Sequence, residues 1–329
     1  MTAILAVEQL TTRFATRTGT VSAVEDVTFE VYPGETFAIV GESGSGKSVT
    51  AYSILRLNEA SAIVTGRVRF KNCDLLRLSE CELRAIRGAG IAMIFQDPMT
   101  TLHPMLRIEQ QMVDAILAHR AVSHAEARRQ AEAALAAVNI VPADERLRAY
   151  PHQLSGGMRQ RVAIAIAMLN RPDVIIADEP TTALDVTTQA QIITQMKALC
   201  AGSGTTLIWI THDLAVVAEI ADRIAVMYAG NIVETGPADA VLSCPAHPYT
   251  AGLLASIPSN NPGSRRLPQI PGSLQSAATV GGCRFAPRCT RRRTECDVFP
   301  ALASITAART VRCVYPLPER EAIACREAG

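Results

Sequence analysis

A glycine-rich loop between an apolar run and a helical run constrains the fold of this chain more than any other stretch. The loop is Gly41-Glu42-Ser43-Gly44-Ser45-Gly46-Lys47-Ser48, and it fits the pattern G-x-x-x-x-G-K-[ST]. Residues 36–40 before it predict a buried strand, and residues 48–55 after it predict a helix. In that order they form an anion site, because successive N–H groups and the positive helix end face one point. The alternative is an ordinary glycine-rich turn.

The residue types in the loop suit the binding of phosphates. Gly41, Gly44 and Gly46 let the backbone bend so that its N–H groups converge. Lys47 is expected to reach the β- and γ-phosphates of a nucleotide, and Ser48 is expected to hold Mg²⁺.

Length and charge limit the class of protein. The chain has 329 residues, enough for a full-size core and a smaller appendage. It has 32 Lys and Arg against 31 Asp and Glu, whereas a protein that mainly coats nucleic acid is usually more basic. The apolar runs are shorter than the roughly 18 residues that cross a bilayer. Because the start also lacks the features of a secretion signal, we expect a cytosolic chain that can dock on a membrane protein.

The residues before and just after the loop predict strands. Residues 3–31 alternate apolar and polar positions, which is typical of antiparallel strands. Phe14 in this part is a candidate to stack on a nucleotide base, and a core phenylalanine is the alternative. Residues 66–70 predict another strand, and residues 79–87 predict a short helix.

An amide follows the next apolar strand, residues 91–95. Gln96 stands there before Asp97-Pro98, at a natural hinge, where an amide can bond both to Mg²⁺ and to a water. An ordinary strand exit is the alternative.

Residues 99–170 have a helical pattern, within which Ser123 and Glu126 predict a capping box. A second glycine motif, residues 154–161 (LSGGMRQR), opens a long helix. A serine and two glycines at a helix N-terminus again predict an anion-binding end.

Two further apolar strands end in polar side chains. Residues 174–178 end in Asp178 and Glu179, where Asp178 can bind Mg²⁺ through water and Glu179 can accept a proton from attacking water. A solvated turn is the alternative. His212 follows the strand at residues 206–210 and can reach the same crevice, because ligands sit at the carboxyl ends of the strands in a doubly wound sheet. It alternatively caps the next helix.

Five of the nine cysteines fall after residue 282, in a segment rich in Pro and Gly where we expect short helices. Cys283, Cys289, Cys296 and Cys313, with gaps of five, six and sixteen residues, suggest a metal or iron–sulfur site, and unrelated buried thiols are the alternative. The gaps do not match the C-x₂-C pairs common for zinc. Cys325 is expected to be a spare thiol in a terminal helix.

The motifs together resemble the ATP-binding subunit of ABC transporters over residues 3 to about 240. The order is Walker A (41–48), Q-loop (Gln96), signature (154–161), Walker B (174–179), D-loop (183–185) and H-loop (His212). The resemblance implies an α/β P-loop NTPase fold in residues 1–240, with an antiparallel β subdomain and a helical subdomain at about 97–170. The residues that it assigns to ATP are Phe14, Gly41, Ser43, Gly44, Ser45, Gly46, Lys47, Ser48, Val49, Gln96, Asp178 and His212.

In that family two such domains pair head to tail and bury two ATP molecules. The resemblance implies that Ser155, Gly156, Gly157 and Gln160 face the P-loop of the partner, with Asp185 in the D-loop. It makes Glu179 the general base, His212 the contact to the γ-phosphate and Gln96 its sensor, with Lys47 also catalytic. Ser48, Gln96 and Asp178 would bind Mg²⁺.

The tail resembles the oligopeptide/dipeptide/nickel importer branch. The stretches that carry this resemblance are residues 247–254 (HPYTAGLL), 257–258, 270–273 (IPGS) and 282–289 (GCRFAPRC). In that branch a C-terminal extension, here residues 241–329, carries cysteines that hold a [4Fe–4S] cluster. Residues 96–104 fit the same branch, although His103 stands where asparagine is expected and Gln153 where glutamate is expected.

We therefore predict an ATPase subunit that couples ATP hydrolysis to peptide import. Its expected partners are a second ATP-binding subunit, the same or a related chain, two transmembrane permease subunits and a periplasmic or extracellular solute-binding protein, with no nucleic acid. It is expected at the cytoplasmic face of the inner membrane, as a peripheral subunit. Import of nickel or another small solute is one alternative, and a soluble ABC ATPase acting on nucleic acid or ribosomes is another. The cysteines alternatively hold zinc or nothing.

Overall fold

The structure is a computed structural model, and it describes residues 2–16, 19–182, 184–257, 268–274 and 281–318. Ala183 of the expected D-loop and Cys325 lie outside the described residues. The chain divides into two compact units. One unit comprises residues 1–31, 35–76 and 211–329, and the other comprises residues 32–34 and 77–210.

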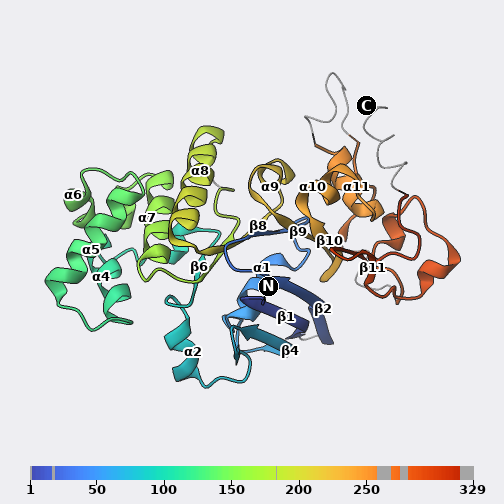
Figure 1. Ribbon diagram of the computed structural model, residues 1–329, viewed down its shortest axis with the longest axis horizontal. Coiled ribbons are helices and arrows are strands. Elements are labelled where there is room, and N and C mark those ends of the chain that lie inside the picture. Colours follow the sequence, from blue (N-terminus) through green and yellow to red (C-terminus); the bar gives the residue numbers. More distant parts are fainter. Residues whose placement is uncertain (1, 17–18, 183, 258–267, 275–280, 319–329) are drawn as a thin grey trace. The chain divides into compact units, whose positions relative to one another are not determined.

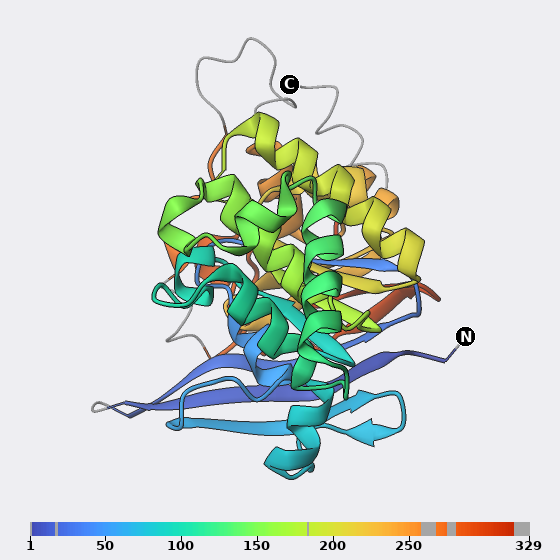
Figure 2. The ribbon, with the colours of Figure 1, turned by 90° about the vertical axis from the view of Figure 1, so that its left-hand side faces the viewer.

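The first unit contains an antiparallel sheet at its N-terminal end. Its strands are β1 (Leu5–Thr16), β2 (Gly19–Val31), β4 (Ala62–Phe70) and β5 (Cys73–Asp74), in the order β2-β1-β4-β5. Leu5 pairs with Val31 on one side and with Phe70 on the other. Figure 2 shows β1 and β2 as long neighbouring strands in dark blue. The predicted antiparallel strands over residues 3–31 are confirmed.

A second sheet of the first unit joins the P-loop strand to the C-terminal residues. Its strands in spatial order are β11 (Ala303–Thr306), β12 (Arg309–Val311), β10 (Asn231–Pro237), β9 (Arg223–Tyr228) and β3 (Thr36–Val40). Only the pair β3–β9 in this run is parallel. The sequence patterns did not predict β9 to β12. Residues after 240 therefore continue the sheet of the cassette within one compact unit.

Helices cover this sheet and share its core. They are α1 (Lys47–Ile54), α9 (Leu214–Ile220), α10 (Ala238–Ser243) and α11 (Pro248–Ala255), with short 3-10 turns η4 (Ala286–Arg288) and η5 (Thr294–Asp297) beyond them. One core cluster contains Val40 of β3, Tyr228 of β9, Tyr249 of α11 and Phe285. The C-terminal residues thus pack into the same core as the P-loop strand.

The second unit has a parallel sheet with apolar, buried strands. The order is β8 (Thr206–Thr211), β7 (Val174–Asp178) and β6 (Ile91–Ile94), and all three predicted strands are confirmed. Continuous apolar runs are typical of parallel strands that are covered on both faces.

Helices make up the rest of the second unit, as the pattern over residues 99–170 predicts. They are α2 (Glu80–Ile86), α3 (Pro98–Thr101), α4 (Ile108–Leu117), α5 (His124–Ala137), α6 (Ala143–Leu147), α7 (Gly156–Met168) and α8 (Val186–Ser203), with the 3-10 turn η1 (Pro151–Gln153). Figure 1 shows α4 to α7 gathered in green, and contacts link α5 to α4, α6 and α7. Among the described helices of the chain, none combines the length and apolar character needed to span a bilayer.

The predicted capping box at the start of α5 is only half formed. Ser123 Oγ accepts a hydrogen bond from the Glu126 N–H at 3.2 Å. The Glu126 carboxylate instead accepts from Gln130 and Arg129 on the next turn, so the reciprocal bond to Ser123 is missing. A complete capping box stands at the start of α2, between Ser79 and Glu82.

Candidate active site

The glycine loop lies between β3 and α1, as the sequence predicts. Gly46 ends the loop with φ 103°, and a Cβ there would lie 2.7 Å from the Ala23 carbonyl oxygen. A Cβ on Gly41 would lie 2.2 Å from the Met227 carbonyl oxygen. Both positions therefore require glycine, because any side chain would collide with backbone. The close fit holds the loop against the end of β9.

Lys47 lies at the helix end of this loop and points back into it. Its side chain is only 4% exposed, and Nζ donates to the carbonyl oxygens of Gly41 at 2.9 Å and Glu42 at 3.1 Å. Ser45 is fully buried, and its hydroxyl has no hydrogen-bond partner among the described atoms. A buried hydroxyl without a partner costs free energy. The chemistry of the loop fits an anion, which would accept hydrogen bonds from both side chains.

Other candidate ligands of the first unit lie on strands or directly after them. Phe14 is half-buried in β1, where it pairs with Val21 and Ala62, so it is not a fully buried core residue. His212 is exposed and directly follows β8, and the next helix is capped by Asp213, whose carboxylate accepts from the Ala215 N–H.

In the second unit, two strand ends bring Gln96 and Glu179 together. Gln96 Nε2 donates to Glu179 Oε2 at 3.3 Å, and the Thr182 hydroxyl donates to the same oxygen at 2.9 Å. Glu179 has φ 45°, a conformation that costs free energy in a residue other than glycine. Asp178, the last residue of β7, is fully buried. The arrangement fixes one carboxylate oxygen of Glu179 and leaves the side chain 9% exposed.

Caps order the two helix starts that the resemblance assigns to a partner. Ser155 Oγ accepts from the Met158 N–H at 3.3 Å at the start of α7, and Ser155 and Gly156 are exposed. Asp185 caps α8, and its hydrogen bonds from the Thr188 N–H and hydroxyl lower the pKa of that carboxyl. Gln160, further along α7, is only 2% exposed.

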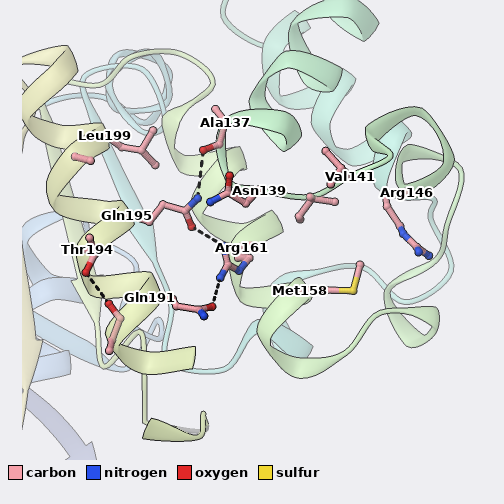
Figure 3. Close-up of a pocket in the computed structure, with 13 residues that line it drawn as sticks. Ala137, Asn139, Val141, Arg146, Met158, Arg161, Gln191, Thr194, Gln195 and Leu199 are labelled. Atoms are coloured by element: carbon pink, nitrogen blue, oxygen red, sulfur yellow. Dashed lines mark hydrogen bonds between the residues drawn. The ribbon is translucent and has the colours of Figure 1, made fainter. Parts of the chain in front are cut away.

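A hollow of about 970 Å³ in the second unit is separate from these residues. Figure 3 shows Arg161 of α7 directed toward Gln191 and Gln195 of α8, to which it donates at 2.9 Å and 3.1 Å. The hollow contains none of the residues expected to contact ATP. Arg161 therefore joins the helix of the second glycine motif to the helix that Asp185 caps.

The four cysteines of the expected metal site line one small hollow of the first unit. Cys283, Cys289, Cys296 and Cys313 all border it, and burial raises the pKa of the Cys313 thiol to about 11. Within the described residues, however, no three His, Cys, Asp or Glu side chains are arranged to hold a metal ion. The described side chains as they stand therefore form no metal site, and burial raises the pKa of the Cys283 and Cys289 thiols.

Comparison with known families matches both ends of this chain. Residues 24–182 match the family described as ABC transporter, and residues 233–296 match the family described as oligopeptide/dipeptide transporter, C-terminal region. The first match includes the glycine loop and Glu179, and the second includes three of the four cysteines.

Curated relatives and solved structures agree with these matches. The dipeptide transport ATP-binding protein DppD of Bacillus subtilis is 49% identical, over 95% of this chain and 95% of its own. The oligopeptide transport ATP-binding protein OppD of Escherichia coli is 44% identical, over 96% of this chain and 94% of its own. The solved dimer of MJ0796, a bacterial ABC transporter cassette, is 31% identical with a TM-score of 0.64, and covers 71% of this chain and 98% of its own. The chain therefore belongs to the ATP-hydrolysing, ATP-binding subunits of the ABC-type peptide transporters.

Proposed function

We propose that this chain powers an ABC importer that takes up di- or oligopeptides across the inner membrane. The observation that carries the proposal is the similarity to DppD and OppD, which extends through the C-terminal region as well as the cassette. Cassettes are common to all ABC proteins, so the matched C-terminal region favours peptides over other solutes. We place the chain at the cytoplasmic face, as a peripheral subunit.

The loop and its neighbours bind ATP in this proposal. The backbone N–H groups of residues 41–46 and the Lys47 ammonium neutralise the phosphates. Ser48, Gln96 and Asp178 would hold Mg²⁺ through the oxygen ligands that it prefers, and a bound ion would supply positive charge next to the phosphates. Phe14 stacks on the base, which its half-buried position in β1 supports.

Glu179 acts as the general base for water. Its carboxylate is oriented by the hydrogen bonds from Gln96 and Thr182, so a second oxygen edge is presented to the water that attacks the γ-phosphate. His212 contacts the γ-phosphate. Because Gln96 also belongs to a strand exit that leads into α3, it is placed to report the state of the nucleotide to the helical region.

A second ATP-binding subunit, either another copy or a related chain, completes each site. The exposed tip of α7 at Ser155, Gly156 and Gly157 faces the partner's phosphate loop, and Asp185 stands at the same boundary between subunits. MJ0796 was solved as a dimer, including a post-hydrolysis state with ADP and Pi, which supports this pairing. Gln160 supports the tip from inside α7 rather than touching the nucleotide.

The remaining partners are two transmembrane permease subunits and a periplasmic or extracellular solute-binding protein. The helical part, residues 97–170, passes the motion of the ATPase dimer to the permeases. Residues 1–240 and 241–329 are functional parts in this proposal, although residues 1–31, 35–76 and 211–240 belong to the same compact unit as the extension.

The cysteines stay a candidate [4Fe–4S] site on the strength of the matched C-terminal region and their shared hollow. Sulfur donors favour iron–sulfur clusters or zinc. Iron and sulfide analysis of anaerobically purified protein, with its visible absorption, tests this part. Colourless, iron-free protein would rule out the cluster but not the import function, because ATP binding and hydrolysis do not use the cysteines.

Two alternatives have less support. Import of nickel or another small solute would use the same ATPase, but DppD and OppD are named for the transport of dipeptides and oligopeptides. A soluble ABC ATPase acting on nucleic acid or ribosomes would need a basic surface, and the net charge here is +1.

Purification of the whole membrane assembly tests the proposal. The companions should be two permeases, an ATP-binding subunit and a solute-binding protein. After reconstitution into vesicles, labelled di- and oligopeptides should accumulate only with ATP, and nickel should not compete. Co-purification with ribosomes or DNA, or nickel uptake without peptide uptake, would contradict it.

A further inference from the structure

Glu42, the second residue of the phosphate loop, is held by the C-terminal residues. Its N–H donates to the Tyr249 hydroxyl at 2.9 Å, and its carboxylate accepts from both terminal nitrogens of Arg288, at 2.7 Å and 3.1 Å. The Glu42 carbonyl in turn accepts from Lys47 Nζ and from the Ser45 N–H. One residue thus connects the C-terminal extension to the lysine that is expected to bind the phosphates.

Arg288 is a fixed side chain rather than a surface ion. It is only 6% exposed, its Nε donates to the carbonyl oxygen of Pro271, and its Nη2 donates to that of Ile270. The guanidinium lies 5.7 Å from the centre of the Tyr228 ring. A paired, fork-shaped contact of this kind fixes the geometry of its carboxylate.

Tyr249 is fixed as firmly by aromatic packing. It is fully buried, its ring meets Tyr228 edge-on with centroids 4.6 Å apart, and Phe285 lies 5.5 Å away. The Tyr249 hydroxyl, which accepts the hydrogen bond from the Glu42 N–H, therefore has little freedom to move.

We propose that Arg288 and Tyr249 are positioning residues for the phosphate loop, and that they raise its affinity for nucleotide. Tyr249 holds the backbone of Glu42. Arg288 neutralises the Glu42 carboxylate, which would otherwise repel the phosphates of a nucleotide bound in the same loop. Less reorganisation is then required when the nucleotide binds. The inference rests on the phosphate-binding role of residues 41–48 in the proposed function.

The two contacts give the extension a direct effect on ATP binding. Arg288 ends η4, the turn that lies between Cys283 and Cys289.

The first test compares Arg288→Gln with Arg292→Gln by calorimetric titration with MgADP. Arg292 is a matched control, because it lies in the same segment but pairs with Asp297 at 2.9 Å while 54% exposed. We expect about tenfold weaker binding in Arg288→Gln, the loss that one charge-assisted contact gives, and no change in the control. The KM for ATP should rise while kcat changes less than twofold. Equal affinity in a folded Arg288→Gln protein would overturn the inference.

Two further variants separate positioning from a merely structural role. Glu42→Gln combined with Arg288→Gln should regain most of the lost affinity, because the repelling charge is gone, and the loss in Arg288→Gln alone should shrink at high salt. If the double variant instead loses MgADP affinity by the product of the two single-variant losses, charge neutralisation is refuted. Tyr249→Phe removes only the hydroxyl and should weaken MgADP binding several-fold even if the Arg288 variant fails to fold. Unchanged binding in Tyr249→Phe would refute its part.

Lys47→Ala distinguishes this inference from the proposed function. If Lys47→Ala abolishes MgADP binding while Arg288→Gln leaves it intact, only the positioning role fails. If Lys47→Ala binds normally, the nucleotide site itself is misassigned.

Discussion

Glu179 combines an unfavourable backbone conformation with two hydrogen bonds to one carboxylate oxygen. A positive φ in a buried, non-glycine residue persists only where the surroundings hold it, and such residues cluster at functional sites. The neighbouring Asp178 is fully buried. We propose that these two neighbouring carboxylates have separate tasks, Asp178 as a ligand of the metal and Glu179 as the base for water.

Glu179→Gln should abolish turnover and keep ATP binding. The amide matches the shape of the carboxylate but cannot accept a proton from water, and loss of a general base costs about 10²- to 10⁴-fold in rate. Phosphate release and nucleotide titration measure the two effects, and gel filtration with ATP should detect a trapped dimer. Glu145→Gln, at an exposed position on α6, is the control and should hydrolyse normally. Hydrolysis by the Glu179 variant at the wild-type rate would end the general-base assignment.

Some residues of the candidate site can be predicted from the sequence, and others cannot. The loop glycines and Glu179 follow from pattern, because their chemistry and their local strand or helix context are both written within a few positions. The contact between Arg288 and Glu42 joins residues 246 positions apart, and nothing in the arginine-rich run at 288–293 distinguishes its buried member from the exposed ones. Gln160 belongs to a motif, yet its place on the inner face of α7 decides its exposure.

At the scale of elements, predictability follows burial. The parallel strands β6, β7 and β8 are continuous apolar runs, so they stand out in the sequence. The strand β11 is exposed at every position and has four residues, so no alternation marks it. It forms because β12 offers a hydrogen-bonding edge, which is a tertiary cause.

The start of α5 provides a prediction on an element. Ser123→Ala removes the acceptor of the Glu126 N–H and should lower the free energy of unfolding by about 1 kcal/mol. Because the Glu126 side chain makes no return bond to Ser123, we expect no further loss from a capping box. Urea unfolding measures the change. Ser123→Asp keeps the cap and should match the wild type, so an equal loss in both variants would show that the hydroxyl does not act as a cap.

At the scale of the whole chain, the C-terminal residues are part of the cassette's own fold. Glu234 of β10 is fully buried and accepts from the N–H groups of Ala246 and His247 at 2.8 Å and 2.9 Å, and from Arg309 of β12 at 2.6 Å. One carboxylate thus ties three segments together. The boundary that we propose near residue 240 is therefore not a boundary between compact units.

Breaking this pair should destabilise the cassette and the extension together. Arg309→Met leaves the buried Glu234 carboxylate without its counter-charge, and loss of one partner of a buried pair costs about 3–5 kcal/mol. Arg67→Met, which breaks an exposed pair with Glu8, should cost about 0–1 kcal/mol. In urea, far-UV circular dichroism and the reaction of Cys313 with a thiol reagent should change at one midpoint, and that shared midpoint should fall in Arg309→Met. If Cys313 of the wild-type protein reacts at a clearly lower urea concentration than the circular dichroism midpoint, the extension unfolds by itself. The contacts of Arg288 and Tyr249 with the phosphate loop would then be lost before the strand that precedes the loop unfolds.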